Sequence, residues 1–322
     1  MSMESKYIWM NGELVEFDKA NIHFLTPALH YGVGVFEGIR CYAAERGPAI
    51  FRLKEHLERL LDSARVLGFR EMPYSLAELS DAVRLTVTAN DFGECYIRPL
   101  IYLTHGGWNL TVDAGRPSVG IAVWEWNNYL GAEALEHGIR ANIASFTRHH
   151  PNVMMTKAKI TGNYANSVLA KTESMRLGFD EAIMLDPQGY VAECTGENIF
   201  VVRGGKIYTP PTSAVLEGLT RDSLLTLAHD LGYEVVEAMI SRDHLYIADE
   251  VFVSGTAAEV VALREIDFRV IGGGKMGPVT RAMQQAFQAA IHGRHARSAE
   301  WLDYLDAGAE LKLPVSEPAD AG

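Results

Sequence analysis

The sequence predicts a mixed α/β (α+β) protein with two domains. Its 322 residues exceed what one hydrophobic core ordinarily holds, so the chain is expected to divide. Hydrophobic residues make up 48% and charged residues 22%, the balance of an ordinary globular protein. Short strand-like apolar runs alternate with segments whose apolar residues recur at helical spacing. Helices and sheets are therefore expected together.

The predicted N-terminal domain covers residues 1–127 and opens with a β-hairpin. Two apolar runs flank Asn11-Gly12, a pair that strongly favours a hairpin turn. Apolar residues at helical spacing predict a helix over 53–67, which Gly68 can end. Three further elements are expected in this half: a helix at 76–89 and strands at 96–103 and 119–124.

Residues 128–138 contain glycines and polar residues and are expected to link the first domain to a larger one at 139–308. The tail at 309–322 is rich in Pro, Ala and Glu and is expected to be disordered. The elements expected in the second domain are strands at 140–146, 181–185, 199–202 and 251–254 and helices at 164–177, 221–231 and 278–292.

Composition argues against several functional classes. The chain has 29 Lys and Arg against 41 Asp and Glu, so no nucleic-acid partner is expected. The N-terminus lacks a signal-peptide pattern, and no apolar stretch is long enough for a membrane span. Cys41, Cys95 and Cys194 form no C-x-x-C pair, which favours a reducing cytoplasm. His149-His150 has no carboxylate or cysteine at ligand spacing, so no metal site is expected.

Two glycine-rich stretches are weak candidates for function. The run from Gly32 to Gly38 misses dinucleotide-binding spacing by one residue. Gly272-Gly273-Gly274 lacks the rest of a phosphate-loop motif and is expected to form a hairpin turn.

Lys157 and Lys159 stand just before an abrupt Gly162-Asn163 break and a predicted helix. A lysine amine attacks carbonyl groups when its pKa is lowered. Most lysines are solvated, and both of these would lie on one face of an expected strand. The local pattern leaves open which lysine, if either, reacts.

Two later patterns suit a charged cofactor. Glu193 precedes a glycine turn and a strand, where a buried carboxylate could pair with a protonated ring nitrogen. A loop of surface acids is the alternative, above all for Glu197. After Gly218, a helix start with Thr220 as the expected N-cap would offer backbone N–H groups to a phosphate. An ordinary capped helix is the alternative there.

In this order, the motifs resemble those of the fold-type IV pyridoxal-phosphate enzymes, most closely the branched-chain amino acid aminotransferases. The resemblance runs from about Tyr7 to Leu305. The matching strings are His30–Arg40, His56–Leu60, Tyr96–Pro99, Lys159 with Gly162-Asn163-Tyr164, Glu193 with Gly196-Glu197-Asn198, Gly218–Asp222 and Ser254–Glu259.

The resemblance implies a two-domain fold of this type and pyridoxal 5'-phosphate as the cofactor. The family's cofactor-bearing lysine lies five residues before the tyrosine of Gly-Asn-Tyr, which selects Lys159. Glu193 would hold the ring nitrogen protonated, Tyr164 would bond the phenolic oxygen, and Arg59 would bind the phosphate. The full implied set is Arg59, Lys159, Tyr164, Glu193, Gly218, Leu219, Thr220, Gly255 and Thr256.

The implied reaction exchanges an amino group between L-leucine, L-isoleucine or L-valine and 2-oxoglutarate. An apolar wall would bind the aliphatic side chain. Arg98, Tyr31 and Tyr129 would hold the distal carboxylate of glutamate. In relatives, Tyr31 and Leu110 reach in from the neighbouring subunit, which implies a homodimer or higher homo-oligomer. The full implied substrate set is Tyr31, Phe36, Gly38, Arg40, Tyr96, Arg98, Leu110, Trp126, Tyr129, Thr256, Ala257 and Ala258.

Trp108 is a departure, because close relatives tend to carry smaller residues in this loop. It puts the detailed substrate range in question. The rival functions are a D-amino acid or amine transaminase of the same fold, an aminodeoxychorismate-type lyase, and a non-catalytic binding protein.

Overall fold

The computed structural model describes residues 4–105, 108–113, 115–126 and 132–305. Its contacts divide the chain into two compact units. Unit 1 comprises Met1–Trp126, Ala158–Gly162 and Ile291–Gly322, and unit 2 comprises Asn127–Lys157 and Asn163–Ala290. Helices and strands occur in both units, so the predicted mixed α/β class is confirmed.

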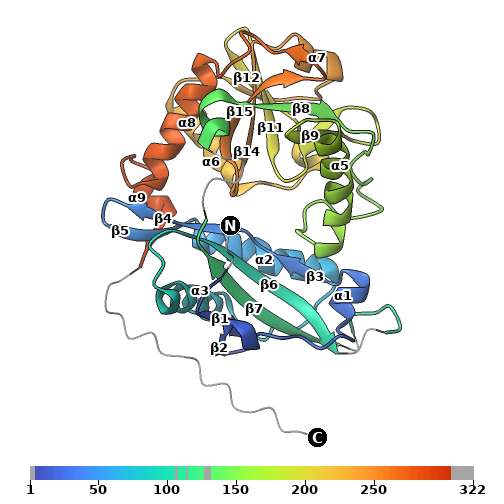
Figure 1. The fold of residues 1–322 in the computed structure, drawn as a ribbon, viewed down its shortest axis with the longest axis vertical. Helices are drawn as coiled ribbons and strands as arrows, with labels where there is room; N and C mark the ends of the chain where they lie inside the picture. The colour runs from blue at the N-terminus through green and yellow to red at the C-terminus, as the bar shows by residue number, and fades with distance from the viewer. Residues whose placement is uncertain (1–3, 106–107, 114, 127–131, 306–322) are drawn as a thin grey trace, which may run out of the picture. The chain divides into compact units, whose positions relative to one another are not determined.

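Unit 1 is built on one antiparallel sheet (Figure 1). The hairpin between its first two strands turns at Asn11-Gly12 with φ angles of 49° and 103°, as predicted. The sheet order is β17-β5-β4-β6-β7-β1-β2, and β3 pairs with β6. The strand bounds are β1 Tyr7–Met10, β2 Glu13–Glu16, β3 Gly34–Phe36, β4 Ile39–Ala44, β5 Gly47–Phe51, β6 Cys95–His105, β7 Arg116–Trp124 and β17 Leu302–Tyr304.

Two long helices pack on this sheet. In α2 (Leu53–Leu67), apolar residues at helical spacing face the core, and Gly68 ends the helix with φ 102°. In α3 (Leu76–Asn90), Ser75 and Glu78 form a capping box at the first turn. Figure 1 shows both helices running along the sheet, where α2 contacts β3 and α3 contacts β1, β6 and β7. The shorter elements of unit 1 are η1 Phe17–Lys19, α1 Pro27–Tyr31 and α9 Ser298–Trp301.

A five-residue segment, Ala158–Gly162, joins unit 1 from the middle of the chain. The side chains of Ala158 and Ile160 are buried in the unit 1 core, and Ile160 forms a β-bridge with Val35. The backbone N–H of Gly162 donates to the carbonyl of Gly32 at 3.2 Å. Lys159 is therefore held within unit 1.

Unit 2 contains a mixed sheet in the order β10-β9-β8-β15-β14-β11-β12-β13, with β16 on β15. Three of its pairings, β8–β9, β8–β15 and β12–β13, are parallel. The strand bounds are β8 Ile139–Ile143, β9 Glu181–Leu185, β10 Val191–Cys194, β11 Asn198–Arg203, β12 Lys206–Thr209, β13 Val235–Glu237, β14 Glu250–Gly255, β15 Glu259–Ile266 and β16 Arg269–Val270.

Three helices of unit 2 match the predicted periodic segments. The helix bounds are α4 Ala132–His137, α5 Tyr164–Arg176, η3 Thr212–Ala214, α6 Leu219–Asp230, α7 Arg242–Tyr246 and α8 Pro278–Ile291. The short helix η2, Thr161–Asn163, begins in the unit 1 segment and ends at the first residue of the next unit 2 segment. The α4 helix lies inside the span expected to be a linker at 128–138. The domain limits 1–127 and 139–308 stay a prediction, and the tail 309–322 lies outside the described residues.

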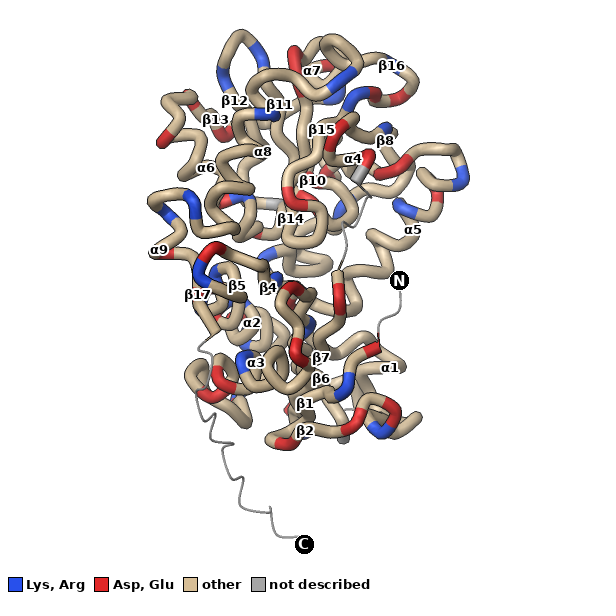
Figure 2. The backbone as a smooth tube through the Cα atoms, turned by 60° about the vertical axis from the view of Figure 1, so that its left-hand side comes forward, with Lys and Arg blue, Asp and Glu red and all other residues tan. Residues whose placement is uncertain are grey.

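Two local predictions are wrong. The β15–β16 hairpin turns at Asp267-Phe268, both with positive φ, whereas Gly272-Gly273-Gly274 follows β16 and leads to α8. Lys157 lies in a turn and Lys159 directly before the isolated β-bridge residue Ile160, so the two lysines do not share a strand. None of the described helices is long and apolar enough to cross a membrane. Figure 2 shows acidic and basic residues interspersed along the backbone of each unit.

Candidate active site

Lys159 is fixed through its backbone and lies beside an aromatic ring. Its N–H donates to Ser63 Oγ at 3.0 Å, and its carbonyl accepts from the N–H of Phe36 at 3.1 Å. Its half-buried side chain places Nζ 5.0 Å from the centre of the Phe36 ring. Because the N–H and the carbonyl of Lys159 are both hydrogen-bonded, the backbone that carries the amine is fixed.

Lys157 has a different environment, in unit 2. Its Nζ donates to the carbonyl of Thr212 at 2.6 Å and also pairs with Glu217. Both side chains of that pair are largely exposed, as in an ordinary surface ion pair. The two lysines that the sequence could not separate therefore differ in burial and partners.

Arg59 forms part of a buried charged cluster with Glu37 and His56. The Nε and Nη2 atoms of Arg59 donate to the two oxygens of Glu37 at 2.7 and 2.8 Å. His56 Nδ1 lies 2.7 Å from the same carboxylate. Burial raises the pKa of Glu37, but Arg59 and His56 more than offset it, so this pKa lies well below its usual range. Burial lowers the pKa of His56.

Arg98 lies among three aromatic rings of unit 1. Its guanidinium carbon is 4.7 Å from the ring centre of Phe36, 5.2 Å from Tyr96 and 5.8 Å from Trp124. Arg98 Nη2 donates to the Tyr96 hydroxyl at 3.2 Å. Its buried Nε has no hydrogen-bond acceptor among the described residues. A buried cationic donor without an acceptor suits an anionic ligand group.

Tyr96 explains why Gly38 is glycine. A Cβ at Gly38 would lie 1.9 Å from the Tyr96 hydroxyl oxygen. The Tyr96 ring also packs against Trp126, with ring centres 4.7 Å apart. Across the β4–β6 pairing, Arg40 is opposite Tyr96, and its guanidinium pairs with Glu94 at 2.8 Å. Tyr96, Arg98, Trp124 and Trp126 thus form one cluster of aromatic and cationic side chains.

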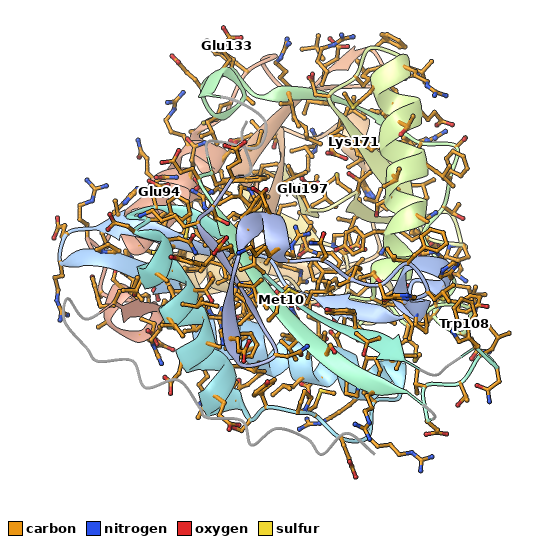
Figure 3. The ribbon with its side chains drawn as sticks, turned by 60° about the horizontal axis from the view of Figure 1, so that its bottom comes forward. Met10, Glu94, Trp108, Glu133, Lys171 and Glu197 are labelled. Carbon is orange, nitrogen blue, oxygen red and sulfur yellow. The ribbon has the colours of Figure 1, made fainter. Side chains whose placement is uncertain are left out.

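Tyr31 and Leu110 are on the outside of unit 1, with 44% and 78% of their surface exposed. Trp108 lies against the rings of His30 and Tyr31, at 5.0 and 5.7 Å between centres. Figure 3 shows Trp108 and Glu94 beyond opposite ends of β6. Tyr129 lies outside the described residues.

In unit 2, Glu193 on β10 is buried and paired with Arg148. Arg148 Nη2 lies 2.8 Å from Glu193 Oε1, and both side chains are less than a tenth exposed. The N–H of Leu216 donates to Glu193 Oε2 at 3.3 Å. Arg148 also donates to Asn166 Oδ1 at 3.4 Å. The carboxylate is therefore fixed from two sides.

The start of α6 corrects the predicted cap. Gly218 is the N-cap, without a side-chain cap bond, and Thr220 is a buried residue inside the first turn. A Cβ at Gly218 would lie 2.0 Å from Asn198 Oδ1, so the close approach of β11 requires glycine. The helix start offers the backbone N–H groups and the positive dipole end that bind anions.

Two more predicted positions lie at turns and helix ends of unit 2. The turn Thr256–Ala258 joins β14 to β15, and a Cβ at Gly255 would lie 3.1 Å from the Gly196 carbonyl. Half-buried Tyr164 begins α5 directly after Asn163, whose Nδ2 donates to the Met155 carbonyl at 3.3 Å.

Glu197 is not the surface acid that the alternative interpretation expected. It is 5% exposed, and burial together with the nearby Glu181 carboxylate raises its pKa to about 8. Glu181 is itself buried and paired with Lys171. Figure 3 labels Lys171 and Glu197 within this part of unit 2.

Sequence reasoning did not assign Glu37, His56, Ser63 or Arg148. Glu37 and His56 stand inside the matching motif strings, so a signal is present in the sequence. Arg148 precedes His149-His150, a pair that suggests only metal binding. Ser63 carries no signal beyond its place on the buried face of α2.

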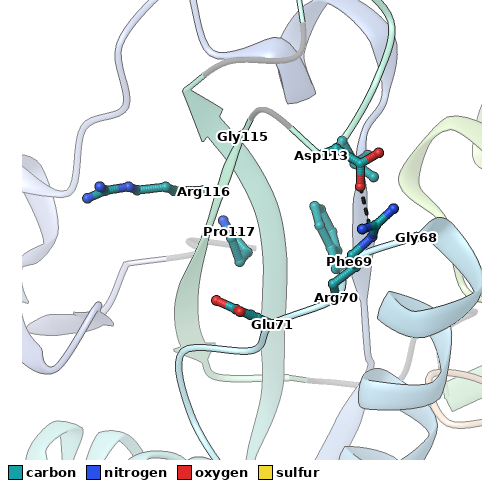
Figure 4. A pocket seen from close by; sticks show the side chains of 9 residues that line it. Gly68, Phe69, Arg70, Glu71, Asp113, Gly115, Arg116 and Pro117 are labelled. Carbon is teal, nitrogen blue, oxygen red and sulfur yellow. Dashed lines mark ion pairs between the residues drawn. The ribbon is translucent and has the colours of Figure 1, made fainter.

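Other candidate sites are weaker. Among the described residues, no group of three or more His, Cys, Asp or Glu side chains could hold a metal ion. A hollow of about 310 Å³ lies in unit 1, where Arg70 pairs with Asp113 at 3.0 Å. Figure 4 shows this ion pair beside the other lining residues. Gly68, Phe69, Glu71, Val112, Gly115, Arg116 and Pro117 complete the lining of the hollow. These lining residues include no Lys, Ser, Thr or Cys.

Comparisons with known proteins identify the family of this chain. The model of the class IV amino-transferase family matches residues 34–266. The branched-chain-amino-acid aminotransferase of Pseudomonas aeruginosa is 48% identical, over 94% of this chain and 98% of that protein. The Escherichia coli K12 enzyme of the same name is 46% identical, with the same shares covered.

Solved structures give the same result. A crystal structure of the Escherichia coli branched-chain amino acid aminotransferase matches with a TM-score of 0.91 and 45% identity, over 94% of this chain and 100% of that one. The holo-form of the Thermobaculum terrenum enzyme, which contains PLP, matches at 0.87 and 34%, over 94% and 99%. The predicted fold-type IV architecture is confirmed, and the chain belongs to the class IV aminotransferase family.

Proposed function

We propose that this chain is a branched-chain-amino-acid transaminase, which moves the amino group between leucine, isoleucine or valine and 2-oxoglutarate. One observation carries the proposal from the structure: Lys159 Nζ and the Arg98 guanidinium both lie within 5.0 Å of the Phe36 ring centre. An amine, an aromatic surface and a guanidinium thus lie close together, and this supports a site with a reactive lysine, an apolar wall and a carboxylate anchor. The relatives at 46% and 48% identity bear the corresponding name.

The cofactor of this class of enzymes is pyridoxal 5'-phosphate, and we propose that four parts of this chain bind it. When bound, the cofactor supplies an electron-withdrawing ring that stabilises negative charge at the substrate α-carbon. Lys159 offers the amine, and Glu193 offers an acceptor for the ring nitrogen. Arg59 and the start of α6 suit the phosphate. A Cβ added at Gly218 would lie 2.0 Å from Asn198 Oδ1, so the residues at this helix start are closely packed.

Lys159 also serves as the proton carrier in this proposal. With the cofactor bound, its Nζ would take the proton from the substrate α-carbon and would deliver that proton to the cofactor carbon C4′. The bonds to Ser63 Oγ and Phe36 N–H hold the Lys159 backbone while the side chain moves. Tyr164 is proposed to bond the cofactor's phenolic oxygen, and the backbone of Thr256–Ala258 to receive the α-carboxylate.

Two unlike substrates must use one side-chain pocket. Phe36, Tyr96 and Trp126 offer apolar surface to an aliphatic chain. Arg98 Nε, which has no acceptor among the described residues, is proposed to bind the distal carboxylate of glutamate. Tyr31 and Tyr129 are proposed to assist.

We also propose a homodimer or larger homo-oligomer in the cytoplasm. The exposed Tyr31 and Leu110 are the side chains expected to enter the neighbouring subunit's site. A mass measurement in solution that finds only monomer would contradict this part.

The function is tested with a panel of amino donors and 2-oxoglutarate as acceptor. L-Leucine is expected to react and to yield L-glutamate, whereas D-alanine and 1-phenylethylamine are not. Absence of turnover with L-leucine refutes the proposal. Release of pyruvate from aminodeoxychorismate without an amino acceptor would favour the lyase.

A matched pair of variants tests the lysine. Lys159→Ala is expected to lose turnover and the visible absorption of the bound cofactor. Lys157→Ala is expected to keep both, because that side chain is engaged with Thr212 and Glu217. Cofactor loss in the Lys157 variant would overturn the assignment.

A further inference from the structure

Glu37 is a buried carboxylate that the proposed reaction does not use directly. It lies between β3 and β4, and none of its side chain is exposed. Its backbone N–H donates to the carbonyl of Pro99 at 3.0 Å, which ties it to β6. A carboxylate buried to this degree is costly unless it is paired and hydrogen-bonded.

The carboxylate of Glu37 is fully engaged with two basic side chains of α2. Oε1 accepts from Arg59 Nε, and Oε2 accepts from Arg59 Nη2, so the guanidinium is held along one whole edge. Oε2 also contacts His56 Nδ1, one turn earlier on the helix. The Arg59 side chain is only 13% exposed. Glu37 therefore holds two of the three guanidinium nitrogens of Arg59.

The same helix holds the backbone of Lys159. Ser63 follows Arg59 by four residues, so the two side chains share a face of α2. Ser63 Oγ accepts from the Lys159 N–H at 3.0 Å. The Phe36 N–H, next to Glu37 in the chain, donates to the Lys159 carbonyl at 3.1 Å. Glu37, Arg59 and Lys159 thus belong to one bonded assembly within unit 1.

We propose that Glu37 is a positioning residue for the cofactor phosphate: by holding the Nε–Nη2 edge of Arg59, it determines which guanidinium edge faces the phosphate. The inference rests on the proposed role of Arg59 in the cofactor site. Glu37 is expected to affect the binding of the phosphate alone, because Glu193 and Tyr164 are the residues proposed to bind the cofactor ring.

The test compares cofactors with and without phosphate. Apo-protein of wild type and Glu37→Gln is titrated with pyridoxal 5'-phosphate and with pyridoxal, and the dissociation constants are compared. The variant is expected to bind pyridoxal 5'-phosphate at least about 10-fold more weakly, as for loss of a charged hydrogen bond. Pyridoxal affinity is expected to change by less than about 2-fold, because pyridoxal lacks the group that Arg59 would bind.

Asp303→Asn is the matched control. Asp303 forms the same two-bond pairing with Arg84 in unit 1, at 2.9 and 2.6 Å, on α3 and β17. Both variants remove a carboxylate charge from an arginine pair. Only the Glu37 variant is expected to weaken the phosphate-bearing cofactor selectively. Equal weakening of both cofactors in Glu37→Gln would mean a general structural role and would overturn the proposal.

Arg59→Lys separates this inference from the proposed function. If that variant binds pyridoxal 5'-phosphate normally, Arg59 is not the phosphate anchor and both statements fail. If it binds weakly while Glu37→Gln binds normally, the role of Glu37 alone fails. In the double variant, the loss is expected to be no larger than in Arg59→Lys alone, because Glu37 acts through Arg59.

Glu37→Asp keeps the charge but draws it back by one methylene, and provides a second test if the glutamine variant does not fold. The expected result is again a selective loss for the phosphate-bearing cofactor. Unchanged selectivity between the two cofactors in this variant would refute the positioning role.

Discussion

Replacing Arg148 by methionine should destabilise unit 2 and disturb the proposed partner of the cofactor ring. Arg148 and Glu193 are 2.8 Å apart, with 9% and 8% of their side chains exposed. Removing one partner of a buried ion pair costs about 3–5 kcal/mol, because the other charge remains buried. Glu193 keeps the 3.3 Å bond from the Leu216 N–H, so we expect the lower end, about 3 kcal/mol.

The assay is thermal unfolding of wild type and variants. For a unit of this size, about 3 kcal/mol corresponds to a fall in Tm of roughly 6–12 °C. The control is Arg203→Met in the same unit, where Arg203 pairs with Asp249 and both side chains are about half exposed. This variant is expected to lower the free energy of unfolding by less than about 1 kcal/mol.

The double variant Arg148→Met with Glu193→Gln leaves no buried charge, so its loss should be smaller than the sum of the two single losses. Equal falls in Tm for the Arg148 and Arg203 variants, or strict additivity in the double variant, would refute the reasoning.

Three further predictions concern other features. Gly38→Ala places a Cβ 1.9 Å from the Tyr96 hydroxyl oxygen and should lower the free energy of unfolding, measured by chemical denaturation, by about 1–3 kcal/mol. An unchanged denaturation midpoint would contradict the close packing of Gly38 on Tyr96. Burial raises the pKa of Glu197 to about 8, so the folded chain keeps a proton that the unfolded chain releases near 4.5. The stability of the wild type should therefore fall as the pH rises from about 4.5 to about 8. Glu197→Gln should show a smaller fall in Tm than the wild type over that range, and an equal dependence of Tm on pH in the two proteins would contradict this. Trp108→Ala removes a ring contact to Tyr31 and should raise KM for glutamate roughly 2- to 10-fold more than KM for leucine, whereas equal changes would exclude a role through Tyr31.

The sequence predicted the elements whose determinants are local. The α2 helix has a continuous apolar face, and its end needs only the positive φ of Gly68. The first hairpin depends on Asn11-Gly12, which takes the required turn conformation without help from the rest of the chain. The short strands β3, β4 and β5 were missed, because their burial on both faces removes the alternating pattern.

The candidate site residues were predicted mainly from the order of the motifs along the chain. The contacts that hold these residues in place were not predicted. Lys157 and Lys159 differ through partners distant in the sequence, such as Ser63 for one and Thr212 for the other. The N-cap of α6 is Gly218 rather than Thr220, and this position is glycine because Asn198, from another strand, leaves no space for a Cβ. Such long-range steric and polar contacts carry no periodic signal.

The pairing of β17 with β5 has a consequence for synthesis on the ribosome. Leu302 pairs with Phe51, so one edge of the unit 1 sheet stays open until about 250 further residues have been made. At about 5–20 residues per second, that interval lasts roughly 12–50 s. The segments of unit 2 emerge within it, so unit 2 can fold while the nascent first sheet still exposes the edge of β5. Chaperone binding during that interval is expected to favour the nascent N-terminal part over unit 2, since an unpaired strand edge is a site of mispairing.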